Sequence, residues 1–121
     1  MNESRFEISP QDSYILVAIT GYLNEELGEK LEKELLARIV SGKQRVVIDM
    51  SHCDLINSPG VALLFDLCIR ITEDFLGWVS FCHLTPLMAD VFAMAGVLPM
   101  AEQFPDVVSA AEQARNWTPP D

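Results

Sequence analysis

The stretch that decides the fold runs from Val46 to Val61 and reads VVIDMSHCDLINSPGV. Its first residues are β-branched and apolar, which is typical of a buried strand. Polar residues follow, and a Ser-Pro-Gly step at 58–60 then opens an apolar segment. Serine is favoured at a helix cap and proline in the first turn. The pattern predicts a strand, a loop and a helix in succession, with Ser58 at the amino terminus of the helix.

Strand and helix patterns alternate on both sides of this stretch. Residues 5–9 and 14–20 predict an antiparallel hairpin, and Asn24 is expected to cap a helix that runs to about Val40. The remaining predicted elements are a strand over 45–50, a helix over 59–74, a strand over 78–82, a helix that Thr85 and Pro86 start and Gly96 ends, a short last strand or turn into which residues 97–100 lead, and a helix over 106–115.

This order of elements predicts an α/β fold. Right-handed crossovers would give a mixed, mainly parallel sheet of four to five strands with an antiparallel edge strand, packed with about four helices. Ligands of such sheets usually bind at the carboxyl ends of the strands, where we expect the loop over 49–58 to lie. The length of 121 residues suits one domain spanning 1–121, with a frayed tail over 116–121.

The charge balance narrows the class of partner. Eight basic residues against eighteen acidic ones give a formal net charge of −10. Such a surface repels nucleic-acid phosphates and anionic lipid, so no direct nucleic-acid partner is expected. No segment approaches the roughly 20 apolar residues of a membrane span, so we expect no membrane insertion. A protein partner with a basic face fits better, although acidity also serves solubility alone.

The cysteines indicate the compartment. Cys53, Cys68 and Cys82 are odd in number and lack the spacing of a disulfide framework. The amino terminus has no basic region followed by an apolar stretch, as a secretory signal would have. Reduced thiols in a soluble cytoplasmic protein fit this pattern, and the sequence leaves the oligomeric state open.

The hydroxyl of Ser58 has two compatible interpretations. As a cap it would accept a hydrogen bond from the first turn of the helix, worth about 1 kcal/mol. As a phosphorylation site it would hold a dianion against the free N–H groups of that turn. Thr85-Pro86 uses the same device where no function is suspected, which favours capping.

In this stretch the chain resembles the STAS family, the bacterial anti-sigma-factor antagonists, and the similarity covers essentially all of it. Residues 47–61 resemble the family's apolar strand, its Asp-Ser-Ser/Thr-Gly step and the apolar helix that follows. Gly-Tyr-Leu-Asn at 21–24 resembles its Gly-x-Leu-Asp step. Residues 91–97 and 108–111 resemble its closing helix, glycine and alanine-rich end.

The resemblance implies a STAS-like fold and a binding function without enzymatic activity or cofactor. Such proteins bind an anti-sigma factor, often itself a serine kinase, and phosphorylation of the motif serine, here Ser58, reverses the binding. Asn57 replaces the usual Asp, and Pro59 replaces a small hydroxylated residue. The residues expected to contact the partner are Asp54, Ile56, Asn57, Ser58, Pro59, Gly60 and Val61. Core burial of Ile56 and Val61 and a turn role for Asn57 stay open.

Other functions fit the residues less well. A STAS subunit of a transporter or of a larger signalling complex, without phosphorylation control, is the main alternative. A receiver domain phosphorylated on Asp49 would need an acidic pair after the first buried strand and a lysine near the last strand, and neither is present. We expect Asp49 to order its loop instead. No glycine-rich phosphate loop or nucleophile paired with a histidine is visible.

A metal site is the last alternative, since His52, Cys53, Cys82 and His83 end neighbouring elements. Adjacent residues of an extended chain point to opposite sides, so only one member of each pair would converge. We therefore expect structural cysteines, surface histidines and no metal.

Overall fold

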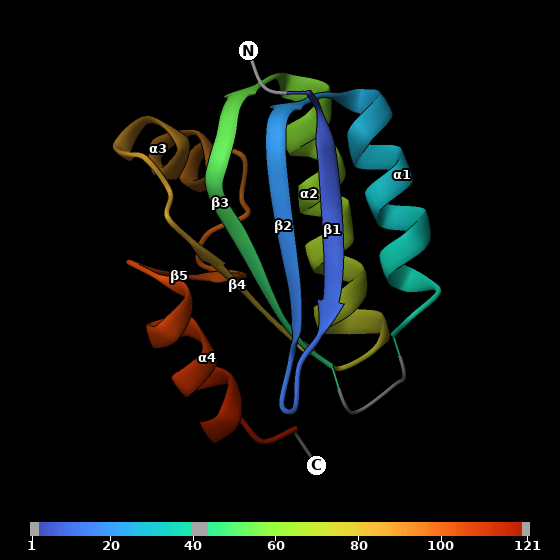
Figure 1. The fold of residues 1–121 in the computed structure, drawn as a ribbon, viewed down its shortest axis with the longest axis vertical. Helices are drawn as coiled ribbons and strands as arrows, with labels where there is room; N and C mark the ends of the chain where they lie inside the picture. The colour runs from blue at the N-terminus through green and yellow to red at the C-terminus, as the bar shows by residue number, and fades with distance from the viewer. Residues whose placement is uncertain (1–2, 40–43, 120–121) are drawn as a thin grey trace.

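The computed structural model describes residues 3–39 and 44–119 (Figure 1). In chain order the elements are β1 (Arg5–Pro10), β2 (Ile15–Leu23), α1 (Glu25–Leu36), β3 (Arg45–Ile56), α2 (Ser58–Ile69), the π-helical turn η1 (Arg70–Asp74), β4 (Trp78–Cys82), α3 (Pro86–Met94), β5 (Glu102–Phe104) and α4 (Val107–Asn116). The strands form one sheet in the order β1-β2-β3-β4-β5. β1 is antiparallel to β2 and the other pairs are parallel, so the predicted mixed sheet and its antiparallel edge hairpin are confirmed.

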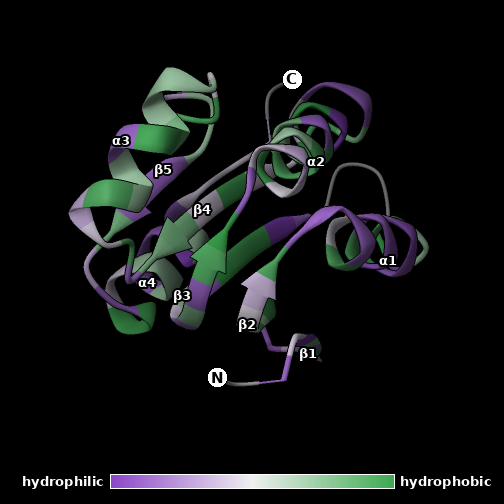
Figure 2. Cartoon of the chain, turned by 90° about the horizontal axis from the view of Figure 1, so that it is seen from above, coloured by the Kyte–Doolittle hydropathy of each residue, from purple (hydrophilic) through white to green (hydrophobic). Residues whose placement is uncertain are grey.

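Helices cover both faces of the sheet (Figure 1). The larger core lies on the face of α1 and α2, where Leu31 and Leu64 pack with Ile48 of the central strand. The smaller core lies under α4, whose Ala110 packs against Val47. Because β3 carries Val47 and Ile48 on opposite faces, an unbroken apolar run suits it. In the view from above, the hydrophilic side of α1 faces outward (Figure 2).

Several predicted boundaries are wrong. β3 does not end at residue 50 but continues to Ile56, so the expected loop over 49–58 is mostly strand. The extension has a tertiary cause, because β2 also runs on, to Leu23, and pairs with β3 up to the Leu23–Ile56 partners. The short last strand, β5 at Glu102–Phe104, follows residues 97–100, as the sequence predicts.

The helices also differ from their predicted lengths. α1 ends at Leu36, whereas its predicted end at Val40 lies outside the described residues. The predicted helix over 59–74 divides into α2 and η1. Along the part of the chain that the structure describes, no helix has the length and apolar character needed to cross a membrane.

The end of the chain is held more firmly than the sequence indicates. Trp117, assigned above to a frayed tail, accepts hydrogen bonds at its carbonyl oxygen from Arg45 Nε and Nη2, at 3.3 and 2.8 Å. The guanidinium also lies 5.3 Å from the centre of the Trp117 ring, a cation–π distance. The carboxyl end of α4 is thereby tied to the start of β3.

Candidate partner-binding site

Asn57, not Ser58, caps α2. Its Oδ1 accepts a hydrogen bond from the Gly60 N–H at 2.9 Å, and its backbone is extended, as at an N-cap. Its Nδ2 donates to Tyr22 Oη at 2.9 Å, so the side chain is held from β2 as well. The expectation that the Ser58 hydroxyl caps the helix is therefore wrong.

The first turn of α2 presses against the end of β2. The Asn57 N–H donates to the Leu23 carbonyl oxygen at 3.1 Å. A Cβ at Gly60 would lie 2.5 Å from the same oxygen, closer than any real Cβ contact. Gly60 thus allows α2 to pack closely against β2, and this packing fixes the position of Ser58 at the surface.

The Ser58 side chain does not contribute to the cap of α2. Its side chain is exposed, and within the described residues its hydroxyl makes no hydrogen bond. Pro59 has no N–H, and the N–H groups of Gly60 and Val61 donate to Asn57. A phosphate on Ser58 would therefore meet only the N–H of Ser58 itself, which corrects the expectation of several free N–H groups in this turn.

An apolar groove begins at Ser58 and runs between α2 and α3. Its volume is about 400 Å³, and its lining residues are Ser58, Val61, Ala62, Phe65, Val91, Met94 and Ala95. Met94 is 88% exposed although it is apolar. Gly96 lets the end of α3 approach α2, because it has φ +87° and its Cβ would lie 3.0 Å from Phe65 Cε1. Figure 2 shows hydrophobic colour over much of α3.

The predicted partner residues fall into two groups. Asp54, Ser58 and Pro59 are exposed, and Ile56 and Asn57 are half-buried. Gly60 and Val61 are buried, with Val61 only 3% exposed, so their main role is to position the helix. Sequence reasoning missed the contribution of α3. The all-round apolar character of residues 61–71 did signal the α2 side of the groove.

Asp49 lies within β3 rather than in the loop that it was expected to order, and its side chain bonds to the strand backbone. Its Oδ1 accepts a hydrogen bond from the Ser51 N–H at 3.0 Å. Of the four residues of the metal alternative, His52 and Cys53 stand apart: His52 Nδ1 lies 3.1 Å from Ser51 Oγ, and the Cys53 thiol donates to the Leu55 carbonyl. Cys82 and His83 do converge, so the expectation that only one member of each pair would do so is wrong for this pair. Cys53, Cys68 and Cys82 are all buried free thiols.

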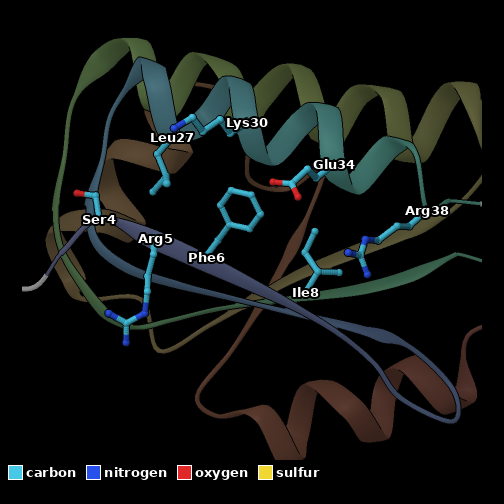
Figure 3. Close-up of a pocket in the computed structure, with 8 residues that line it drawn as sticks. All are labelled: Ser4, Arg5, Phe6, Ile8, Leu27, Lys30, Glu34 and Arg38. Atoms are coloured by element: carbon cyan, nitrogen blue, oxygen red, sulfur yellow. The ribbon is translucent and has the colours of Figure 1, made fainter.

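A second groove lies between β1 and α1 (Figure 3). Phe6, Ile8 and Leu27 supply its apolar side chains, and its volume is about 370 Å³. Lys30 is ion-paired with Glu26 at 3.2 Å. The acidic Glu34 lies between Lys30 on α1 and Arg38 just beyond the end of that helix (Figure 3). This alternation of charge offers no concentrated site for an anion or a cation.

The fold and the exposed helix start define a small α/β binding domain. The sequence profile of the STAS domain matches residues 5–110, so the chain belongs to the STAS domain family. BtrV of Bordetella bronchiseptica, named as a candidate anti-sigma factor antagonist, is 31% identical over 87 residues, which cover 72% of this chain and 74% of BtrV. This relative is named for antagonism rather than catalysis, in agreement with the prediction of a binding module.

Solved structures share the fold. An RsbS variant from Moorella thermoacetica superposes with a TM-score of 0.78 at 22% identity, over 93% of this chain and 97% of that one. The murine anion transporter Slc26a9 contains the same fold within a longer chain, with a TM-score of 0.73 at 15% identity, over 87% of this chain and 18% of the transporter.

Proposed function

We propose that this protein is an anti-sigma factor antagonist that binds an anti-sigma factor through the exposed start of α2 and the adjoining groove. The observation that carries the proposal is the free Ser58 hydroxyl at the mouth of an apolar groove, in a family whose relative BtrV is named for this activity. We also propose a cytoplasmic location, in line with the three buried free thiols.

The groove supplies the contact area of this interface. Phe65 and Val91 are half-buried, and Met94 is exposed, so an apolar side chain of the partner would remove these groups from water. Methionine adapts its shape to different partner side chains at low cost. The net charge of −10 favours a partner with basic residues around its apolar contact.

Phosphorylation of Ser58 would act on this interface through charge. A phosphate adds about −1.5 to −2 charges at neutral pH. Because Pro59 has no N–H and the Gly60 N–H donates to Asn57, the first turn offers the dianion little compensation. Burying it against a partner would cost desolvation energy that neutral Ser58 does not impose, so the partner would be released.

The test is binding of a serine-kinase anti-sigma factor encoded in the same genome, measured by calorimetry with wild type, Ser58→Ala and Ser58→Asp. We expect Ser58→Ala to bind within about twofold of wild type and Ser58→Asp to bind at least about tenfold more weakly. Equal affinities for all three proteins would exclude the charge switch. Failure of all three to bind would contradict the antagonist function itself.

A role as a STAS subunit of a transporter is the second candidate. It is favoured by the occurrence of the fold within Slc26a9. Affinity purification from native cells separates the two functions, because a transporter subunit would recover membrane components, whereas an antagonist would recover the anti-sigma factor.

A further inference from the structure

Three ligand-type side chains meet at the carboxyl end of β4, away from the groove. They are Asp49 of β3, Cys82 at the end of β4 and His83, which follows it. One carboxylate oxygen, the sulfur and one ring nitrogen all lie within 4.8 Å of one another. Among the described residues, this is the one group of three or more His, Cys, Asp and Glu side chains with that proximity.

The sheet brings two of the three together. Asp49 and Cys82 are register partners of the parallel β3–β4 pair, so their side chains lie on the same face. Cys82 Sγ lies 3.9 Å from Asp49 Oδ1. Asp49 is also oriented by the Ser51 N–H, and a hydrogen bond of this kind fixes the direction of a metal-binding carboxylate.

The backbone conformation brings the third side chain, that of His83, into the cluster. Two successive residues of an extended strand point to opposite faces, so strand geometry alone would keep the side chains of Cys82 and His83 apart. His83, however, has φ +59°, in the left-handed region. This conformation ends the strand and turns the imidazole back towards the sulfur. Residues other than glycine seldom adopt this conformation, so the surrounding structure must maintain it.

We propose that Asp49, Cys82 and His83 form a zinc-binding site. One sulfur, one nitrogen and one oxygen donor suit Zn²⁺, whereas Mg²⁺ and Ca²⁺ take oxygen donors. Zinc bonds of about 2.0–2.3 Å in tetrahedral geometry place donor atoms roughly 3.5 Å apart, so small side-chain rotations complete the set. The zinc–sulfur bond forms as the S–H bond breaks, and the proton passes to solvent.

The fourth position belongs to water, because three protein donors leave one corner of the tetrahedron open. Bound zinc would connect the middle of β3, the end of β4 and the segment that leads into α3 at Pro86. Since α3 forms one wall of the groove, the metal would stabilise that wall relative to the sheet.

Zinc titration by calorimetry, with metal content measured after dialysis, tests the site. We expect one Zn²⁺ per chain, a dissociation constant of about 10 µM or tighter, and a higher melting temperature in the presence of zinc. Cobalt in place of zinc should give the near-ultraviolet sulfur-to-metal band that requires thiolate ligation.

The variants separate this site from surface binding. His83→Asn removes the ligand but tolerates a left-handed backbone, so the fold is retained and zinc affinity should fall at least about tenfold. Cys82→Ser should abolish the cobalt band. His52→Ala and Cys53→Ser are matched controls outside the cluster and should bind zinc as wild type does. Equal binding by wild type and His83→Asn, loss in His52→Ala, or no binding at 100 µM zinc, a level about tenfold above the expected constant, would overturn the proposal.

Discussion

The starts of α2 and α3 use the same device and differ by one residue. In α3 the cap Thr85 is followed directly by Pro86, and the Thr85 hydroxyl accepts the Met88 N–H at 3.1 Å. In α2 the cap is Asn57, and Ser58 stands between the cap and Pro59. The Thr85 hydroxyl therefore caps α3, whereas the Ser58 hydroxyl in the first turn of α2 caps nothing. A single additional position thus separates a helix start whose hydroxyl is bonded from one whose hydroxyl is free.

The largest difference in stability effects between the two helix starts should come from the tight packing of Gly60 against β2. Gly60→Ala places a Cβ against the Leu23 carbonyl oxygen and should lower the free energy of unfolding by about 2–3 kcal/mol. Leu87→Ala, in the first turn of α3, truncates a side chain that is 71% exposed and should change it by less than about 0.5 kcal/mol. Urea unfolding followed by tryptophan fluorescence measures both. Equal losses would show that α2 is not packed as tightly as the structure indicates.

The second-largest difference should be in how much each capping side chain contributes to the free energy of unfolding. Asn57→Ala removes both the cap of Gly60 and the hydrogen bond to Tyr22, so we expect a loss of about 2 kcal/mol. Thr85→Ala removes only a cap and should cost about 1 kcal/mol. Tyr22→Phe isolates the second hydrogen bond of Asn57. If Asn57→Ala cost no more than Thr85→Ala, Tyr22 would contribute nothing to the cap.

Alkaline pH should lower the free energy of unfolding through Cys68, which lies on the buried side of α2. Burial raises the pKa of the Cys68 thiol from 9.0 to about 12. Below pH 9 both folded and unfolded chains keep this proton. Above pH 9 the unfolded chain loses it first, so the free energy of unfolding falls as pH rises from 9 towards 12.

Between pH 8 and pH 10 this thiol should account for a fall of about 1 kcal/mol. Cys68→Ala removes that share, so its unfolding curve should shift less with pH than that of wild type. Burial also raises the pKa of Cys82 to about 12, and that part of the fall remains in the variant. Identical pH slopes for the two proteins would contradict the burial of Cys68.

The smallest effect on the free energy of unfolding should come from substitution of Ser58. Ser58→Ala removes a hydroxyl without a partner, so the free energy of unfolding should stay within about 0.5 kcal/mol of wild type. The same fluorescence measurement, beside Thr85→Ala, makes the contrast direct. A loss for Ser58→Ala as large as that for Thr85→Ala would show that Ser58 does cap α2.

Local sequence patterns predicted much of this architecture but not the details of the site. Alternation over 5–9, the β-branched run before Asp49 and the Thr85-Pro86 start each depend on neighbours in sequence, and each prediction is confirmed. The choice between Asn57 and Ser58 as the cap depends on Tyr22, which is 35 residues away. Both candidates are good cap formers, so no local rule separates them.

Long-range pairing also explains the other errors. Residues 51–56 include exposed His52 and Asp54 and therefore resemble a loop, yet β2 extends alongside them and keeps them in the sheet. The left-handed conformation of His83 has no signature in the sequence, and it alone reverses the argument against convergence with Cys82. The α3 wall of the groove escaped prediction because Met94 follows an apolar pattern that is typical of a core.

We propose that charge at Ser58, rather than charge at any helix start, controls partner binding. Calorimetry with one anti-sigma factor should compare Ser58→Asp with Thr85→Asp, which adds the same charge outside the groove and keeps a capping side chain. We predict that Ser58→Asp weakens binding at least about tenfold, while Thr85→Asp stays within about twofold of wild type. Equal weakening by the two variants would contradict the account, because net charge alone would then explain the release.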